Sequence, residues 1–251
     1  MRWKLGFVSA MLLLTGCDEA SDVDEETPEI FMMAAASMTD AVNDLQDLYK
    51  ENHDVEFVVN YGSSGQLRQQ IVQGAPADVF LSASLGDVER LEDEVEIHSS
   101  VRLVENQLTL ISTPGAEEQL DDWSSLADAE LQNIAIGQPD TVPAGQYTME
   151  ALENEALWSA VEPNAVYGSD VRQVLTYVET GNADAGYVYH TDALTSEDVV
   201  IIDHAPEGSH SPIVYPVAQL TDGEATEDFF EWLQSDEAIA VFEDYGFQGV
   251  K

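Results

Sequence analysis

Residues 59–71 read VNYGSSGQLRQQI, a stretch that indicates a strand turning on glycine and serine into an amphipathic helix. The start of a helix presents free backbone N–H groups and the positive end of the helix dipole, so this junction suits an anion. The overall charge opposes such a ligand, because the chain carries 49 Asp and Glu against 8 Lys and Arg, a formal net charge of −41. An anion held here must therefore depend on uncharged donors.

Length and composition allow a sizeable core. The chain has 251 residues, of which 44% are hydrophobic, and this size fits one large soluble domain or two lobes. The acidic excess is spread along the chain, which is typical of proteins that stay hydrated in concentrated salt and predicts a halophilic protein. Such a surface argues against nucleic acid and anionic membrane surfaces as partners.

The N-terminal residues have the layout of a secretory signal. Arg2 and Lys4 precede an apolar run over residues 5–14, and Leu14-Thr15-Gly16-Cys17 resembles the lipobox of bacterial lipoproteins. We expect a signal peptide over residues 1–16 and lipid on Cys17, followed by a flexible acidic tether over residues 17–29. The alternative is an ordinary signal peptide with an incidental cysteine. Cys17 is the only cysteine, so a disulfide within one chain is impossible.

Strand-like and helix-like runs alternate after the tether, which predicts an α/β protein with mostly parallel sheets. Ligands in such folds lie beyond the carboxyl ends of strands, where loops lead into helices. Without a linker in the middle, two lobes would have to be joined by crossing strands. The expected strands cover residues 30–35, 55–59, 78–82, 108–111, 133–136, 185–189, 199–202 and 215–218.

Several strand-to-helix junctions share small residues and hydroxyl groups, with hardly any positive side chain. Small side chains let backbone N–H groups approach a ligand closely. The junctions are AAASMT at residues 34–39, YGSSG at 61–65, VPAG at 142–145 and GSDV at 168–171, together with the strand end YVY at 187–189.

In these stretches the chain resembles the periplasmic molybdate-binding proteins, which are the solute receptors of molybdate ABC transporters. The likeness runs from about residue 30 to the C-terminus, and the combination of motifs makes it specific. The matching stretches are AAASMTDAV, YGSSGQLRQQI, GAPADVFLSA, QPDTVPAGQYTMEAL, SDVRQVLTYVETGNADAGYVYHTDA, YPVA and the closing YGF.

The resemblance implies a type II periplasmic-binding fold, in which an oxyanion lies between two α/β lobes. Lobe 1 would comprise residues 30–105 plus 206–251, and lobe 2 residues 106–205, with crossings near residues 106–111 and 214–218. The resemblance also implies an extracytoplasmic monomer that is anchored to the membrane by lipid, delivers molybdate to a permease, and needs no cofactor. The function that the resemblance implies is therefore binding, and not catalysis by an enzyme.

Carried over position by position, the oxyanion contacts fall on hydroxyl and amide donors, and no side chain would bind the molybdenum directly. The serines would donate hydroxyl and backbone hydrogen bonds, Ala144 and Val171 their backbone N–H, and Tyr189 its phenol. Gly65 stands where many relatives carry another hydroxyl, which leaves open whether Ser63 or Ser64 is the main donor of that loop. The implied contacts are Ser37, Ser64, Ala144, Val171 and Tyr189, with Ser63 as an additional donor.

The chemistry of the residues agrees with this implication, because neutral donors in a dry cleft can stabilise a dianion. Molybdate, tungstate and sulfate carry no proton near neutral pH and need only donors, whereas phosphate would also use an acceptor. Asp170 is such an acceptor, but its place before Val171 suits it to cap its own helix. Arg68 and Arg172 are expected to pair with nearby carboxylates.

Three alternatives stay open at this point. Ser37 and Ser64 could be helix N-caps with no ligand. The protein could be a receptor of the same fold for another oxyanion, such as sulfate. It could also be a secreted serine hydrolase, although Gly62-Ser63-Ser64-Gly65 lacks the G-x-S-x-G spacing of a nucleophile elbow.

Overall fold

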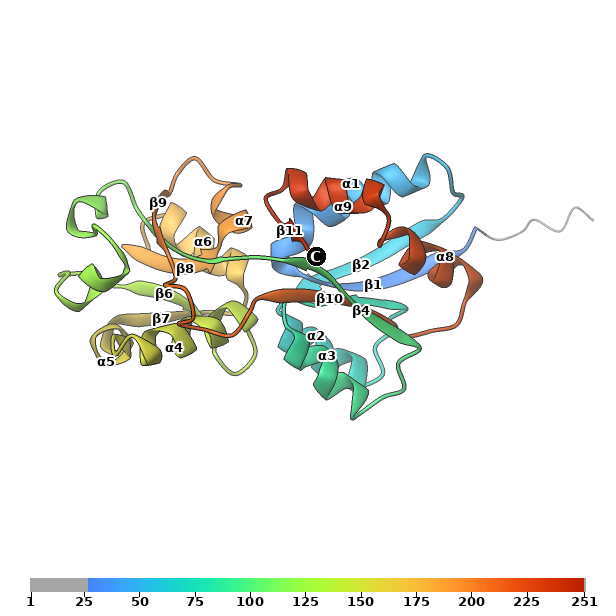
Figure 1. The fold of residues 1–251 in the computed structure, drawn as a ribbon, viewed down its shortest axis with the longest axis horizontal. Coiled ribbons are helices and arrows are strands. Elements are labelled where there is room, and N and C mark those ends of the chain that lie inside the picture. The colour runs from blue at the N-terminus through green and yellow to red at the C-terminus, as the bar shows by residue number, and fades with distance from the viewer. Residues whose placement is uncertain (1–26, 251) are drawn as a thin grey trace, which may run out of the picture.

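The computed structural model describes residues 27–250, which form two lobes that lie side by side (Figure 1). Each lobe is built on one β-sheet with helices packed on it, as the alternating sequence pattern predicts. The signal peptide, Cys17 and most of the acidic tether lie outside the described residues. Within the described range, every helix falls short of the length and apolarity that a membrane span requires.

Lobe 1 contains a six-stranded sheet in the order β11-β4-β10-β3-β1-β2. The fully buried strand β3 lies between β1 and β10, and β1 runs parallel to both β2 and β3. The strands are β1 (Glu29–Ala35), β2 (Glu56–Gly62), β3 (Val79–Leu81), β4 (Ser99–Glu105), β10 (Val214–Gln219) and β11 (Gln248–Gly249).

Helices cover both faces of this sheet (Figure 1). On one face, α2 (Ser64–Val72) and α3 (Leu85–Glu92) enclose a small core that includes Phe80 and Leu91. The other face carries α1 (Thr39–Lys50), α8 (Glu224–Trp232) and α9 (Asp236–Asp244). A short 3₁₀ turn, η1 (Ala36–Met38), joins β1 to α1.

Lobe 2 contains a five-stranded sheet in the order β7-β6-β8-β5-β9. Helix α6 (Val171–Glu179) buries a stripe of apolar residues at the spacing of one helix face, so hydrophobic burial determines how the helix lies on the sheet. The strands are β5 (Leu108–Ser112), β6 (Ile134–Gly137), β7 (Ala165–Gly168), β8 (Ala185–Tyr189) and β9 (Val200–His204). The helices are α4 (Pro143–Asn154), α5 (Trp158–Val161), α6 (Val171–Glu179) and α7 (His190–Ala193), with 3₁₀ turns at Glu117–Gln119, Trp123–Ala127 and Glu162–Asn164.

Two crossing segments connect the lobes. The chain leaves lobe 1 at residues 106–107, between β4 and β5, and returns over residues 205–213, between β9 and β10. The backbone N–H of Asn106 donates to the carbonyl of Ile213 at 3.1 Å, so the two segments are hydrogen-bonded to each other. The Asn106 side chain also donates to Thr191 of lobe 2 at 2.9 Å and to Tyr215 of lobe 1 at 3.2 Å.

The structure corrects two expectations. The predicted return crossing near residues 214–218 is wrong, because these residues form β10 and already pair with β3 and β4. The sheets are mixed and not mostly parallel: β10 is antiparallel to both of its neighbours, and β5 is antiparallel to β8 and β9. The physical reason is that chains crossing between lobes enter each sheet against the direction set by its βα units.

Candidate anion-binding site

A small cavity lies between the two lobes. Lobe 1 supplies the carboxyl ends of β1, β2 and β3, and lobe 2 supplies the starts of α4 and α6 and the end of β8. All six candidate residues named from the sequence line this one cavity. The lining residues are Ala35, Ala36, Ser37, Gly62, Ser63, Ser64, Ala83, Val142, Pro143, Ala144, Asp170, Val171 and Tyr189.

Three buried serine hydroxyls line the lobe 1 side. Ser37 Oγ lies 2.9 Å from the hydroxyl of Tyr215. Ser64 Oγ accepts the backbone N–H of Ala83 at 2.9 Å, which leaves its own hydrogen free to donate. Ser63 Oγ is buried and has no hydrogen-bond partner among residues 27–250. The loop that carries Ser63 and Ser64 therefore offers two hydroxyl donors. Of these, the Ser63 hydroxyl makes no hydrogen bond within the described chain.

Helix capping does not account for these hydroxyls. Met38 occupies the N-cap position of α1, and Ser63 that of α2, yet neither side chain makes a capping hydrogen bond. Ser37 lies inside the 3₁₀ turn, and Ser64 is the first residue of α2. The alternative that Ser37 and Ser64 are only N-caps is therefore wrong.

Two helix starts face the cavity from lobe 2. The first N–H groups of a helix have no partner within the helix, and they carry its positive dipole end. Ala144 is the second residue of α4, and Val171 is the first residue of α6. Asp170 caps α6 by accepting the backbone N–H of Gln173 at 2.9 Å, as predicted. The Asp170 carboxylate is thus already engaged in its own helix.

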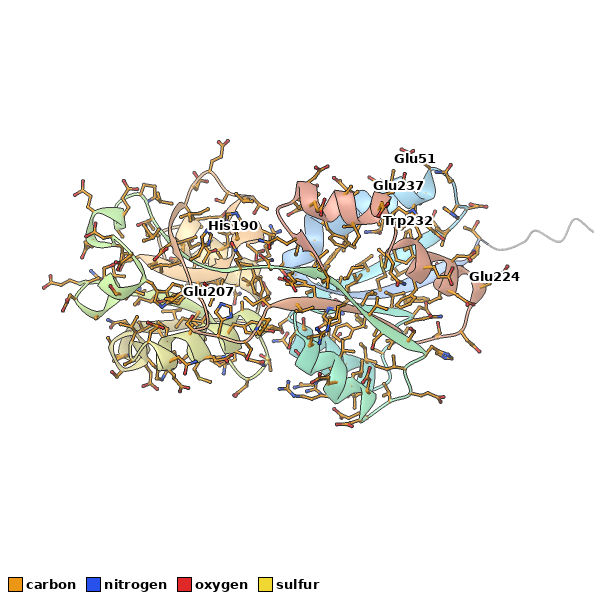
Figure 2. The ribbon with its side chains drawn as sticks, in the orientation of Figure 1. Glu51, His190, Glu207, Glu224, Trp232 and Glu237 are labelled. Atoms are coloured by element: carbon orange, nitrogen blue, oxygen red, sulfur yellow. The ribbon has the colours of Figure 1, made fainter. Side chains whose placement is uncertain are left out.

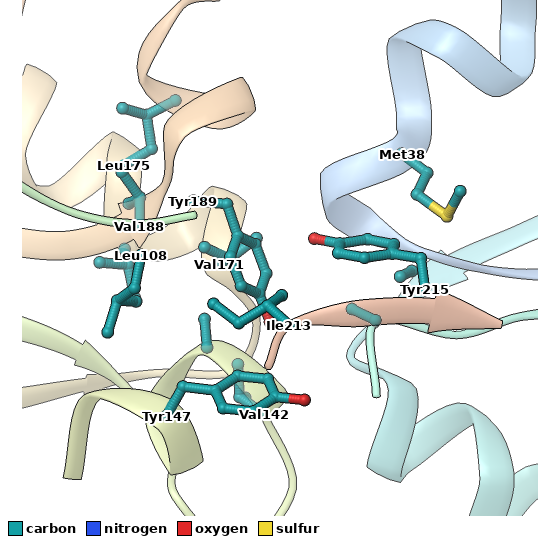
Figure 3. Packing of buried hydrophobic residues seen from close by; sticks show 14 of the residues in the cluster. Met38, Leu108, Val142, Tyr147, Val171, Leu175, Val188, Tyr189, Ile213 and Tyr215 are labelled. Atoms are coloured by element: carbon teal, nitrogen blue, oxygen red, sulfur yellow. The ribbon is translucent and has the colours of Figure 1, made fainter. Parts of the chain in front are cut away.

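Tyr189 adds a phenol from the end of β8. Its hydroxyl is fully buried and has no hydrogen-bond partner within the described chain. Its ring meets that of Tyr215 across the cleft at 5.6 Å and 66° (Figure 3). Burial raises the pKa of both phenols well above their usual value, so both stay protonated and able to donate near neutral pH.

The cavity contains no cationic side chain among its lining residues. Arg68 contacts Asp87 at 3.3 Å and also Glu94, both within lobe 1. Arg172 contacts Asp40 at 2.6 Å and Asp192 at 2.7 Å. The prediction that both arginines pair with carboxylates is confirmed. The site therefore presents hydroxyl and amide hydrogens, each worth about 1.5–3 kcal/mol when it bonds a charged group.

A wider hollow on the outer end of lobe 1 has the opposite chemistry. Carboxylates of Glu29, Asp54, Asp222, Glu224 and Asp228 line it, and these would repel an anion. Among residues 27–250, no group of three or more His, Cys, Asp or Glu is placed to hold a metal ion. The closed cavity between the lobes is therefore the site whose chemistry suits an anion.

Residues 30–248 match the family model of the bacterial extracellular solute-binding proteins. The chain belongs to this family. It is a solute-binding protein of transport and not an enzyme, and its place is outside the cytoplasm. The serine hydrolase alternative is thereby overturned, and within the described chain no histidine lines the cavity.

The alignments with named relatives cover nearly the whole length of this solute-binding protein. YvgL of Bacillus subtilis, provisionally described as an ABC transporter substrate-binding lipoprotein, is 44% identical over 96% of this chain and 95% of the relative. The molybdate-binding protein ModA of Haemophilus influenzae is 37% identical over 97% and 98%. The solved periplasmic molybdate-binding protein of Azotobacter vinelandii, 24% identical, has a TM-score of 0.78 over 88% of this chain and 100% of that chain. The expected family resemblance and periplasmic-binding fold are confirmed.

Sequence reasoning missed two residues that hold the donors of this solute-binding protein in place. Ala83 donates its N–H to Ser64, and Tyr215 bonds Ser37. Both belong to stretches that carry the family likeness, GAPADVFLSA and YPVA, and this was the available signal. Their role depends on contacts between distant segments, since Ser37 and Tyr215 are 178 positions apart.

Proposed function

We propose that this protein captures molybdate outside the cytoplasm and delivers it to the membrane permease of an ABC transporter. The observation that carries the proposal is the closed cavity between two lobes, lined by hydroxyl and amide donors without a cationic side chain. The similarity to proteins named as molybdate-binding supports the choice of ion. Tungstate, with the same charge and shape, is the additional ligand that we expect.

The protonation state of the ion supports molybdate over phosphate. Phosphate is partly protonated near neutral pH and would need an acceptor in the cavity. The one carboxylate that lines the cavity is Asp170, and it already accepts the N–H of Gln173. Sulfate has the charge of molybdate but is smaller, so a receptor for sulfate remains the second candidate. The relatives favour molybdate over it.

In this proposal the oxygens of the ion take hydrogen bonds from both lobes. Ser37 and Ser64 donate from lobe 1, and Ser63 is an additional donor because its hydroxyl is buried without a partner in the described chain. The oxygens also receive the backbone N–H groups of Ala144 and Val171 and the phenol of Tyr189. The ion then touches both lobes, so binding and closure stabilise each other.

The membrane anchor belongs to the same proposal. Residues 14–17 support lipid on Cys17, and the Bacillus relative is described as a lipoprotein. The acidic tether would then hold a monomeric receptor near the permease. Labelling cells with radioactive palmitate tests this point. Label is expected in the wild-type protein and absent from Cys17→Ser, and equal label in both would remove the anchor.

Calorimetric titration with molybdate, tungstate, sulfate and phosphate tests the ligand. Molybdate and tungstate should bind tightest and phosphate weakest. Ser63→Ala and Ser64→Ala should each weaken molybdate binding roughly 10- to 100-fold, as expected for one lost hydrogen bond to a charged group. Ser209→Ala is the matched control, because its hydroxyl is equally buried and without a partner in the described chain but lies outside the cavity. Absence of binding by all four ions at millimolar concentration would remove the proposal.

A further inference from the structure

Arg172 occupies the second position of α6, directly after Val171, whose N–H faces the cavity. Its guanidinium is held in lobe 2 by two contacts, Nε to Asp192 Oδ1 at 2.7 Å and Nη1 to Thr195 Oγ1 at 3.2 Å. The remaining amino group, Nη2, reaches Asp40 Oδ2 at 2.6 Å. Asp40 belongs to the first turn of α1 in lobe 1, just after the 3₁₀ turn that carries Ser37.

This contact is unusual in two respects. Among the ion pairs of residues 27–250, the Arg172–Asp40 pair alone joins the lobes, because the pairs of Lys50, Arg68 and Arg90 all lie within lobe 1. Arg172 is also the only Lys or Arg between residues 106 and 205, a segment with many Asp and Glu residues. Two acidic lobes repel each other as they close, and Arg172 is the cation of lobe 2 that can offset this repulsion.

We propose that Arg172 and Asp40 form an electrostatic latch that holds the lobes closed around the bound ion. This proposal rests on the proposed function. In it Arg172 is a positioning residue, because Arg172 touches Asp40 and not the ion and holds the first turn of α6 against lobe 1. The Asp192 side chain is fully buried and anchors the guanidinium, whereas that of Asp40 is 42% exposed. Asp40 can therefore lose its contact when the lobes open without leaving a buried charge.

The direction in which ligand binding changes when a carboxylate is removed distinguishes the latch from general electrostatic repulsion. Removing any carboxylate from so acidic a protein should favour an incoming dianion. If Asp40 fastens the closed state, Asp40→Asn should do the opposite and speed release of the ion. Asp47→Asn is the matched control, since Asp47 lies on the same helix and is exposed, and its carboxylate makes no hydrogen bond or ion pair with another described residue.

The experiment measures dissociation rates of molybdate, tungstate and sulfate by stopped-flow fluorescence, and the melting temperature of the ligand-free proteins. Asp40→Asn should raise the dissociation rate roughly five- to twenty-fold, the usual range for coupling between a contact and a bound ligand. Its ligand-free melting temperature should equal that of Asp47→Asn. Arg172→Lys, which keeps the charge but cannot span both carboxylates, should also release the ion faster.

The outcomes distinguish the latch from the choice of ion. Equal dissociation rates for Asp40→Asn and Asp47→Asn overturn the latch and leave the proposed function intact. A wild-type protein that binds sulfate but not molybdate overturns the proposed function, and the latch is then judged on sulfate release. A wild-type protein that binds none of the three ions overturns both.

Discussion

At the scale of the residue, the site holds a negative ligand without a positive side chain. Ser63 and Tyr189 present buried hydroxyls that no other described residue satisfies, and buried polar groups without partners are costly. A tetrahedral oxyanion would satisfy them. Acidic side chains elsewhere do not prevent this, because Asp170, the one carboxylate that lines the cavity, is engaged as a helix cap.

The charge of Asp170 provides the first prediction. Asp170→Asn removes a negative charge from the cavity wall, and its amide oxygen can still cap α6. Molybdate affinity should therefore rise several-fold by relief of repulsion, with the melting temperature unchanged. Asp170→Ala also loses the cap, worth about 1 kcal/mol, and should melt earlier. Calorimetry and thermal unfolding provide the measurements, and a weaker molybdate complex in Asp170→Asn would contradict the prediction.

Asp192 provides a prediction on pH. Burial raises the pKa of Asp192 to about 7, although Arg172 opposes this shift. Between about pH 4 and 7 the folded protein keeps a proton that the unfolded chain has lost, so this group's contribution to the free energy of unfolding falls as pH rises. The decline is at most about 1.4 kcal/mol per pH unit.

Comparison with Asp192→Asn isolates this effect from the rest of the acidic surface. The variant lacks the titration and loses the Arg172 contact at every pH, so its stability relative to wild type should improve from pH 5 to pH 8. Thermal unfolding at the two pH values measures the difference. A difference in stability between the two proteins that is the same at pH 5 and pH 8 would show that Asp192 does not titrate in this range.

Among the helices, the starts of α2, α4 and α6 converge on the cavity, and a backbone hydrogen bond joins α2 to lobe 2 there. The N–H of Gly65, the second residue of α2, donates to the carbonyl of Thr141 in lobe 2 at 3.1 Å. A Cβ at Gly65 would lie 2.5 Å from that oxygen, closer than real contacts allow. In this closed arrangement the backbone of Thr141 therefore leaves no room for a side chain at Gly65.

Gly65→Ala should consequently weaken molybdate binding without lowering the stability of the ligand-free protein. Alanine favours a helix over glycine by about 1 kcal/mol, so the ligand-free protein should melt at the same or a higher temperature. Closure is obstructed, and molybdate affinity should fall at least about ten-fold, as expected when the binding-competent state is depopulated. Calorimetry and thermal unfolding report the two effects separately.

Gly86→Ala is the matched control for this change. Gly86 is the second residue of α3, also in lobe 1, and a Cβ there would meet atoms no nearer than 3.6 Å. This variant should gain the same helix stability with unchanged binding. Equal affinities for Gly65→Ala and Gly86→Ala would show that the contact with Thr141 does not limit closure.

At the scale of the whole molecule, acidic side chains cover both lobes. Glu51, Glu224 and Glu237 extend from the outer parts of lobe 1, and Glu207 lies beside lobe 2 (Figure 2). This field repels a dianion that approaches from solution. Salt shortens its range, since the Debye length falls from about 30 Å at 0.01 M to about 3 Å at 1 M.

The association rate of molybdate should therefore rise with salt, by about ten-fold or more between 0.01 and 1 M KCl. The short hydrogen bonds inside the dry cavity are screened much less, so the dissociation rate should change little by comparison. Stopped-flow mixing at several salt concentrations measures both rates. An association rate that falls with salt would imply that a positive field guides the ion, contrary to the composition.

The alternation of strands and helices, the extracytoplasmic family and six of the thirteen residues that line the cavity could be read from the sequence. The alternation follows from apolar periodicity, which depends on neighbours two to four positions apart. The family and the candidate site residues follow from the resemblance that the short junction motifs carry. The same reasoning left the strands β4 and β7 unassigned. These segments are largely half-exposed or charged, so their apolar pattern is weak.

Two further features depend on the folded arrangement of the chain: which donors have no partner, and which contacts hold the lobes together. The mixed strand directions, the Ser37–Tyr215 bond and the Arg172–Asp40 pair join segments that lie far apart, the last separated by 132 positions. No local pattern encodes such contacts, because the first two depend on how distant segments pack within one lobe and the third on how the two lobes meet. The donor groups of the site could therefore be predicted from the sequence. The contacts that hold the closed state could be seen only in the packing of one lobe on the other.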